Sequence, residues 1–390
     1  MRERLLLFLL LCSAISLFGQ TRYVAHVVDA ETKELLPFAS VVRPDGKGTV
    51  SNLKGEFVIE AQPADTLLIT CFGHQGLTIA ASDVGPVVQL HPLTRTMREL
   101  TVMPKESLLT VISRKLTREF KKNKRKKARY FYRQREQDSI SSSLFEGYID
   151  ALSCVNLRES ILRTGQIAGN EDINTFNTFT QVGVMTRDSH FWKINDLITP
   201  LSPDASEKYY AKYYDITLHT LINNDAKVYL FIFKKKDENQ LQPIVTGNLF
   251  IDAKTLQPLT LHGHLENSRV LTNKGLSLFV QKVKVPFHID YQQVNGFTEV
   301  NNITAFINSG MTKHSWLTLY YLRQVDPNQI NYRGYDMSKK SSISDAINEA
   351  GYDPTFWNEN EVIKRTAEEE AIIKQHLSKR KQKELNIKVP

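Results

Sequence analysis

The stretch KVKVPFHIDYQQVNGFTEVNNITAF, residues 282–306, alternates apolar and polar side chains more regularly than any other part of the chain. Side chains that alternate in this way point to opposite faces of a β-strand. The dipeptide Asn295-Gly296 is a strong signal for a tight turn between two antiparallel strands. One face is predicted to carry Val283, Val285, Phe287, Ile289 and Tyr291, and the other Lys282, Lys284, His288 and Asp290.

The segments before this hairpin are also rich in strand-forming residues. KVYLFIFKKK, residues 227–236, leads through a polar loop to IVTGNLFIDAKTLQPLTLHGHL, residues 244–265. Successive long hairpins with one apolar face predict an antiparallel meander. GNLFIDAKTLQPLTL, residues 247–261, resembles the repeated strand of the half-barrel of outer-membrane lipoprotein carriers. The resemblance implies a curved sheet that can hold acyl chains.

The N-terminal part has shorter strands and more turns. PFASVVRPDGKGTVSNLKGEFVIEA, residues 37–61, alternates short apolar runs with glycine turns at Gly46 and Gly55. Such runs recur every 8 to 14 residues up to about residue 92. This spacing is typical of a compact two-sheet β-sandwich.

The same region resembles the carboxypeptidase regulatory-like domain. The resemblance rests on VVDAETKELLPFASVV (27–42), GTVSNLKGEFVIE (48–60), LLITCFGHQG (67–76) and the exit RELTVMP (98–104). It implies a transthyretin-like seven-stranded sandwich that is not itself catalytic and that precedes many gram-negative envelope proteins. His74 stands where that family usually has an aromatic residue. The matching residues are Asp29, Leu36, Pro37, Ala39 to Val41, Thr49, Asn52, Gly55 and Phe57.

The N-terminus MRERLLLFLLLCSAISLFGQ, residues 1–20, is typical of a secretory signal peptide. Its apolar run, Leu5 to Phe18, is shorter than the roughly 20 residues of a membrane span, although a membrane anchor is the alternative. Leu11 before Cys12 disfavours a lipid anchor. We therefore expect an exported protein of the periplasm or outer-membrane periphery.

The remaining cysteines, Cys71 and Cys154, could form a disulfide bond with each other. Two cysteines this far apart in the sequence do not define a disulfide framework, so the pairing stays undecided. Cys71 lies in an apolar run, which favours a small buried hydrophobic side chain.

The chain has a net charge of +8, and its cations are concentrated in residues 114–135, which hold 12 Lys and Arg against one Glu. An export signal argues against nucleic acid as the partner. A solvated helix end and linker is the ordinary interpretation, and contact with anionic lipid or polysaccharide is the functional one.

Helical spacing of Leu108, Leu109, Ile112, Leu116 and Phe120 predicts a helix that ends in the lysine-rich run. The following segments, 130–133 and 144–149, resemble the start of the uncharacterised β-rich domain that often follows the regulatory-like module.

Near the C-terminus, residues 366–369 form a capping box for a helix to about Lys383. The predicted organisation is 1–20 signal, 21–103 sandwich, 104–128 basic connecting helix, 129–335 antiparallel β-rich domain and 336–390 helical segment.

The fold class is therefore mainly β with α: a seven-stranded sandwich, then a larger antiparallel, half-barrel-like sheet with flanking helices. Two histidines in that sheet, His262 and His264, share a strand face and are weak metal candidates. A zinc site needs a further ligand, and we expect Glu266 on the opposite face. The ordinary interpretation of these histidines is a polar, solvent-exposed sheet face, so no metal or other cofactor is predicted.

Aromatic residues suggest a ligand or partner surface: Trp192 with its neighbour Phe191, then Tyr209, Tyr210, Tyr213 and Tyr214. Sheet-edge or core packing is the more ordinary role for such residues. Glu146 and Asp150 lie four apart and would share one side if this segment is helical, but no nucleophile accompanies them, so we expect surface or loop-capping groups.

The sequence contains no His-Glu-x-x-His, Gly-x-Ser-x-Gly, phosphate-loop or Cys-x-x-Cys motif. The leading interpretation is a non-enzymatic exported envelope protein that acts as a binding or structural module, with an envelope protein or outer-membrane component as partner. The alternative is a lipid or lipoprotein carrier, and the third is a hydrolase with an unrecognised site. A carrier needs an open apolar surface, whereas a scaffold has a core closed by helices.

Overall fold

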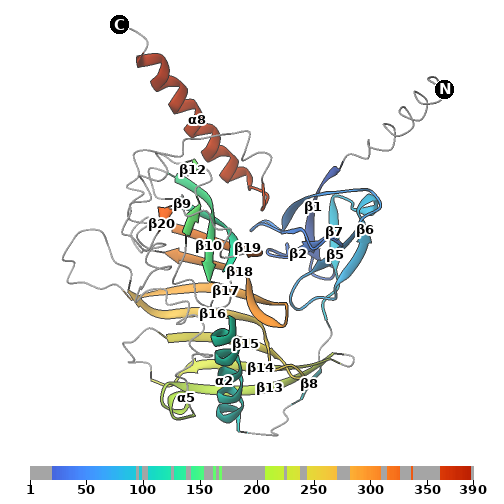
Figure 1. The fold of residues 1–390 in the computed structure, drawn as a ribbon, viewed down its shortest axis with the longest axis vertical. Helices are drawn as coiled ribbons and strands as arrows, with labels where there is room; N and C mark the ends of the chain where they lie inside the picture. The colour runs from blue at the N-terminus through green and yellow to red at the C-terminus, as the bar shows by residue number, and fades with distance from the viewer. Residues whose placement is uncertain are drawn as a thin grey trace, which may run out of the picture. The chain divides into compact units, whose positions relative to one another are not determined.

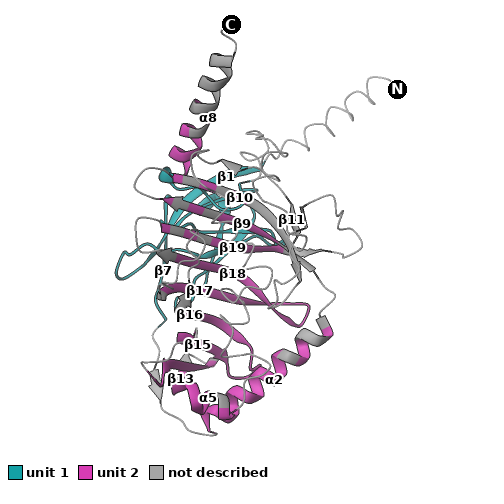
Figure 2. Ribbon diagram, turned by 90° about the vertical axis from the view of Figure 1, so that its left-hand side faces the viewer, with its two compact units in different colours: residues 1–94, 360–368 teal, residues 95–359, 369–390 magenta. Residues whose placement is uncertain are grey.

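The protein is mainly β and divides into two units, which are described separately (Figures 1 and 2). Unit 1 comprises residues 1–94 and 360–368, and unit 2 comprises residues 95–359 and 369–390. The signal segment and Cys154 lie outside the described residues. The structure, a computed structural model, describes residues 20–93, 96–98, 104–123, 127–137, 142–152, 161–163, 167–168, 207–223, 226–237, 244–269, 282–308, 314–325, 335–336 and 361–387.

Unit 1 is a sandwich of a three-stranded and a four-stranded sheet, as predicted for this region. In the first sheet β1 pairs antiparallel with β4 and parallel with β7. In the second, β2 lies between β3 and β5, and β6 pairs with β5. The strands are β1 (Thr21–Asp29), β2 (Ser40–Val42), β3 (Gly48–Val50), β4 (Glu56–Ala61), β5 (Thr66–Thr70), β6 (Leu77–Ala80) and β7 (Val87–Leu90), and the 3-10 turn η2 (Ala81–Asp83) follows β6.

The predicted alternation places the core of unit 1 correctly. Phe57, Leu67 and Ile69 are fully buried, whereas Leu68 between the last two is 46% exposed. Cys71 packs at the edge of this core. Gly55 has φ +69°, and a Cβ there would lie 2.9 Å from the Val27 carbonyl oxygen, so this turn requires glycine.

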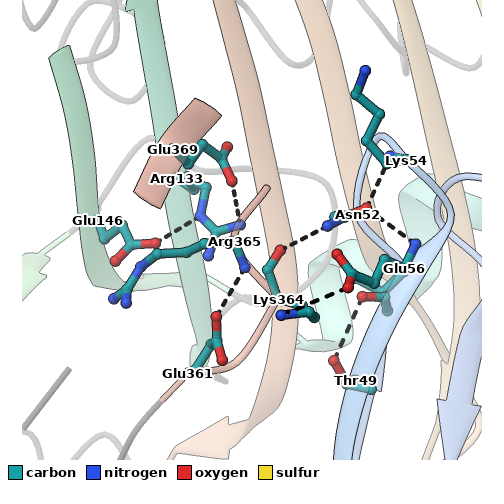
Figure 3. A network of polar contacts seen from close by, with 11 residues as sticks. Thr49, Asn52, Lys54, Glu56, Arg133, Glu146, Glu361, Lys364, Arg365 and Glu369 are labelled. Carbon is teal, nitrogen blue, oxygen red and sulfur yellow. Dashed lines mark hydrogen bonds and ion pairs between the residues drawn. The ribbon is translucent and has the colours of Figure 1, made fainter. Parts of the chain in front are cut away.

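A segment from the far end of the chain completes unit 1. Thr49 Oγ1 donates a 2.6 Å hydrogen bond to the Val362 carbonyl, although 313 residues separate them. Asn52 Nδ2 donates to the Lys364 carbonyl at 3.1 Å (Figure 3). Arg22 pairs with Glu361 at 2.6 Å. Residues 361–366 therefore behave as a strap that belongs to the sandwich.

The loop after β1 is held by a buried carboxylate. Asp29 Oδ1 accepts hydrogen bonds from the Glu31 and Thr32 amides at 2.7 and 2.8 Å, and Oδ2 lies 2.8 Å from His74 Nε2. The Thr32 amide first, and then His74, lower the pKa of Asp29 to about 2. The family resemblance expects an aromatic residue at position 74, and here the imidazole joins this loop to the turn after β5.

We predict that Asp29 makes unit 1 sensitive to acid. Its pKa lies below the ordinary value of 3.8, so its contribution is present above about pH 4 and is lost as the pH falls towards about 2. Asp29→Asn should remove this part of the pH dependence in calorimetric unfolding of the full chain. Asp83→Asn, at an exposed position of the same unit, is the control. An unchanged acid profile in Asp29→Asn would contradict the prediction.

Unit 2 contains one antiparallel sheet of 13 described strands. Figure 2 shows β9 and β15 to β19 of this sheet side by side. Strands β13 to β19 form a continuous meander, and β9 and β10 extend it beyond β19. In sheet order the strands are β20 (Tyr335–Asp336), β11 (Ile161–Arg163), β10 (Ser142–Leu152), β9 (Lys127–Gln137), β19 (His314–Val325), β18 (Phe297–Asn308), β17 (Lys282–Val294), β16 (Pro258–Arg269), β15 (Ile244–Asp252), β14 (Ala226–Lys235), β13 (Tyr214–Asn223) and β8 (Thr96–Arg98), with β12 (Ile167–Ala168) beside β10.

The hairpin predicted for residues 282–306 forms between β17 and β18. Asn295 and Gly296 both have positive φ, 53° and 78°, which is the conformation of a type I′ turn. On β17 the residues Val285, Phe287 and Ile289 are buried. The predicted mainly β class with large antiparallel sheets and few helices is confirmed.

The units differ from the predicted ranges at two places. Strand β8, which lies in the range 21–103, pairs with β13 of unit 2. The strap, which lies in the range 336–390, belongs to unit 1. Residues 144–150 form part of β10 and are not helical, and Glu146 is buried, so its expected role as a surface or loop-capping group is wrong.

Three helices are described in unit 2. Helix α2 (Lys105–Asn123) ends inside the lysine-rich run, as predicted, and α5 (Glu207–Tyr213) leads into β13. Helix α8 (Ala367–Ile387) extends four residues beyond the predicted Lys383. Ile372, Ile373 and Leu377 of α8 pack on Leu144 of β10.

A buried ion triad links α8 to the sheet within unit 2. Arg133 Nε donates to Glu146 Oε1 at 2.7 Å, and Nη1 donates to Glu369 Oε2 at 3.3 Å (Figure 3). All three side chains are at most 6% exposed. The predicted basic segment 114–135 is therefore not one solvated surface, because its strand half buries Arg133, whereas Arg114, Arg118 and Lys122 on α2 are exposed.

We predict that Arg133→Ala destabilises unit 2 by about 3–5 kcal/mol, because two buried carboxylates lose this cation. Denaturant unfolding of the full chain measures the change, with Arg118→Ala as the exposed control. Replacing the whole triad by apolar residues, Arg133→Leu with Glu146→Leu and Glu369→Leu, should recover most of the loss. A loss below about 1 kcal/mol in Arg133→Ala would mean that the triad does not hold α8.

Candidate functional site

The apolar face of the large sheet is the most extensive feature of unit 2. The strand register aligns one apolar side chain from each of six neighbouring strands, β13 to β18. Phe231, Leu249, Leu261 and Ile289 are fully buried, so the row is the centre of the unit 2 core. We call it the apolar row, and its members are Leu218, Phe231, Leu249, Leu261, Ile289 and Ile303.

Two glycines interrupt the neighbouring row on the same face. Gly247 of β15 and Gly263 of β16 stand opposite each other, between Phe233 of β14 and Phe287 of β17. A Cβ on Gly247 would lie 2.2 Å from the His262 carbonyl oxygen, and one on Gly263 would lie 1.9 Å from that of Thr246. The two backbones thus approach so closely that neither position has room for a side chain.

Helix α2 lies diagonally across this face. Near its start, Lys105 Nζ donates to the Ile216 carbonyl of β13. Near its end, Glu119 accepts a hydrogen bond at 3.1 Å from Thr298 Oγ1, and Thr298 follows the Asn295-Gly296 turn. Its inward side chains, Leu108, Leu109, Ile112 and Leu116, are buried. The part of the apolar face beneath α2 is therefore closed in this structure.

Polar contacts at the edges of α2 hold the helix in place. Ser107 Oγ donates to Glu207 Oε1 at 2.9 Å, and Lys115 Nζ donates to the Thr255 carbonyl at 2.5 Å. Gln257 Nε2 lies 3.5 Å from Glu119 Oε1. These are side-chain contacts at the rim, and each contributes about 0.5–1.5 kcal/mol.

The predicted tyrosine surface separates into different environments. Tyr210 is fully buried, and its hydroxyl lies 2.9 Å from Ser113 Oγ of α2. Tyr214 is also buried, edge-on to Phe233. Tyr213 is partly exposed with Lys212 Nζ 4.9 Å from its ring. Tyr210 and Tyr214 pack in the core, which is the more ordinary role that the sequence favoured, so neither belongs to a binding surface. Trp192 and Phe191 lie outside the described residues, and nothing is described of the Tyr209 side chain.

The opposite, polar face carries the histidine candidates. His262 stacks on His288 of β17 with ring centroids 6.1 Å apart, and Asn248 Nδ2 lies 3.2 Å from His262 Nε2. His288 Nε2 lies 2.9 Å from Asp290 Oδ1, and Asn302 donates to Asp290 Oδ2 at 2.8 Å. The sequence placed His288 and Asp290 on this face, but their proximity to His262 follows only from the register of β16 against β17.

The cluster has a defined electrostatic state. Burial lowers the pKa of His262, and His288 lowers it further. Burial would raise the pKa of Asp290, but hydrogen bonds from His288 and Asn302 outweigh it, so that pKa is lowered. The arrangement is thus a neutral imidazole stacked beside an imidazole–carboxylate pair.

His264 lies two residues along the same face, where burial and then Lys284 lower its pKa. The expected position of Glu266 is wrong, because residues 262, 264 and 266 of one strand share a face. Its carboxylate accepts from Thr246 at 2.9 Å, and Lys235 and Lys284 lie 3.3 and 3.5 Å away. Even so, no group of three or more His, Cys, Asp and Glu residues in the described part of the chain could hold a metal.

Among the described helices, none combines the length and apolarity that crossing a membrane would require. No family model and no curated protein matches the chain. The resemblance to the regulatory-like domain is therefore not supported by a family-model match.

Among solved structures, the chain is similar to a LolA superfamily protein from Nitrosomonas europaea, at 9% identity and a TM-score of 0.23, over 55% of this chain and 96% of that one. It is also similar to a DUF1329 family protein from Desulfovibrio piger, at 9% identity and a TM-score of 0.24, over 57% and 93% of the two chains. Matches at these TM-scores carry no argument about function.

We predict that His262 makes unit 2 less stable at mildly acidic pH. The unfolded imidazole binds a proton near pH 6.5, and the folded one binds it only at lower pH, so stability falls as the pH drops below about 6.5. His262→Gln should reduce this fall in denaturant unfolding between pH 7 and about pH 5. His219→Gln on β13 is the matched control. An equal pH dependence in both variants would contradict the prediction.

Proposed function

We propose that this chain is an exported, non-enzymatic binding protein of the cell envelope whose large sheet carries an apolar ligand, such as a lipid acyl chain or a lipidated partner. The observation that supports the proposal is the apolar row, which spans six strands and is covered by an amphipathic helix attached through rim contacts. In this proposal α2 is displaced from the row when the ligand binds.

The magnitudes are compatible with such an exchange. Burial of the four apolar side chains of α2 contributes about 6–12 kcal/mol, at roughly 1.5–3 kcal/mol each. An acyl chain of about 16 carbons gains about 13 kcal/mol at ~0.8 kcal/mol per methylene. The ligand can therefore offset the loss of the helix contacts, so that neither state is overwhelmingly favoured.

The glycine pair gives the ligand a place to enter. Gly247 and Gly263 contribute no side chains between Phe233 and Phe287, so an acyl chain that replaced α2 there would contact backbone and two aromatic rings. The exposed cations of α2, Arg114, Arg118 and Lys122, would face anionic lipid during exchange. Unit 1 would serve as the interaction or spacer module, as its family resemblance implies.

The ligand is tested by mass spectrometry of the organic extract of protein purified from a gram-negative envelope, and by titration of delipidated protein with a fluorescent long-chain fatty acid. Locking α2 to the β15–β16 turn tests the route. Glu119→Cys with Gln257→Cys, in a background with the native cysteines changed to Ser, is joined by a short thiol-reactive linker. The locked form should lose about tenfold or more in affinity.

The two single-cysteine variants treated with the same linker are the controls, and they should bind like the unmodified protein. Absence of lipid from the extract together with no fatty-acid binding by the delipidated chain would refute the carrier proposal. Unchanged binding by the locked form would refute the displacement of α2.

A second candidate is a structural or interaction module with a protein of the envelope as partner. It is favoured by the closure of the apolar face beneath α2 and by the filled, strapped core of unit 1. This candidate predicts an empty organic extract and recovery of an envelope protein by pulldown with the full chain. A hydrolase would need a convergent set of catalytic groups, and esterase and peptidase activity of the full chain would be required to revive that interpretation.

A further inference from the structure

A row of stacked side chains lies on the polar face at one end of the large sheet, away from the apolar row. Phe306 of β18, Trp316 of β19 and Arg135 of β9 are direct cross-strand neighbours. His314 precedes Trp316 by two residues and stands opposite Gln137. We call Arg135, Gln137, His314, Trp316 and Phe306 the stacked cluster.

Stacking fixes the orientation of the arginine. Its Cζ lies 4.2 Å from the centroid of the Trp316 ring, and Phe306 packs on the same ring at 5.2 Å. His314 stacks on Phe306 with ring centroids 5.7 Å apart and an interplanar angle of 22°. A guanidinium held against an aromatic face loses little further freedom when it binds a ligand.

Two hydrogen-bonding groups of the cluster have no partner within the described part of the chain. Arg135 Nη2 donates to Gln137 Oε1 at 3.2 Å. Arg135 Nε and His314 Nδ1 are buried atoms without a hydrogen-bond partner among the residues that the structure describes. Buried hydrogen-bonding groups are nearly always paired in folded proteins, so the Arg135 Nε–H indicates a missing acceptor, as does His314 Nδ1 in the tautomer that carries the proton there.

We propose that the stacked cluster binds an anionic group with two adjacent oxygens, a carboxylate or a phosphate. The Nε and Nη2 edge of a guanidinium matches such a group bidentately. Here a single neutral oxygen, from the exposed Gln137, occupies half of that edge. The anion displaces the Gln137 amide, takes both donors of Arg135 and accepts from His314 Nδ1–H in the tautomer that carries the proton there.

This site is independent of the proposed carrier function, because it lies on the opposite face of the sheet. Three sources share the chemistry: an acidic sugar, a phosphate ester and an anionic lipid headgroup. The side-chain Nε–H resonance of Arg135 in a ¹⁵N spectrum of the full chain, identified by its loss in Arg135→Lys, reports binding directly. The probes are glucuronate, inorganic phosphate, and vesicles of phosphatidylglycerol compared with phosphatidylcholine.

We expect a saturable shift of the Arg135 resonance with at least one anionic probe. Calorimetric titration should show a loss of tenfold or more in affinity for both Arg135→Gln and Arg135→Lys. The lysine keeps the positive charge but lacks the two parallel N–H donors of the guanidinium. Gln137→Ala removes the competing amide and should tighten binding severalfold. Arg118→Gln, an exposed arginine of α2, is the control and should bind like the unmodified protein.

Three results would overturn the proposal: no saturable shift with any probe, equal affinity in Arg135→Lys, or weaker binding in Gln137→Ala. Far-ultraviolet circular dichroism of each variant establishes that the fold is intact. Because Gln137 is exposed, Gln137→Ala keeps the test decisive even where Arg135→Gln unfolds.

Discussion

The register of the β16–β17–β18 ladder is the constraint on which unit 2 depends. Because side chains alternate with a period of two, a slip of one residue would move the apolar row to the polar face and the histidine cluster to the core. The Asn295-Gly296 turn prevents this slip, since both residues adopt the left-handed conformation that a two-residue hairpin requires. With this register, Leu261, Ile289 and Ile303 are aligned across three strands.

The same register gives the two faces of the sheet different chemistry. The apolar row and α2 lie on one face, where burial contributes most of the stability. Polar pairs such as His288 with Asp290 lie on the other face, where Asp290 has hydrogen-bond partners in His288 and Asn302. In the two proposals above, one face would hold an apolar ligand and the other an anionic group, and neither task would require a reactive side chain.

Closure of each unit depends on contacts that the strand pattern does not contain. The strap brings Val362 and Lys364 to Thr49 and Asn52 across more than 300 residues of sequence. Within unit 2, Arg133 pairs with Glu369, which the sequence suggested as a capping residue of α8. Local patterns do not reveal such pairings, because a charged residue on a strand is equally compatible with solvent and with a buried partner.

By itself the sequence determined the sandwich core around Phe57 and Ile69, the hairpin at Asn295-Gly296 and the position of α2, because alternation, turn chemistry and helical spacing are local properties. It could also have suggested the close approach at Gly247 and Gly263, since glycine inside a strand is a recognised signal. The tertiary structure alone decided that His262 meets His288, that Tyr210 is a core residue and that Arg135 stacks on Trp316. Each of these depends on which strands become neighbours and in what register, and that is settled by the packing of the whole sheet.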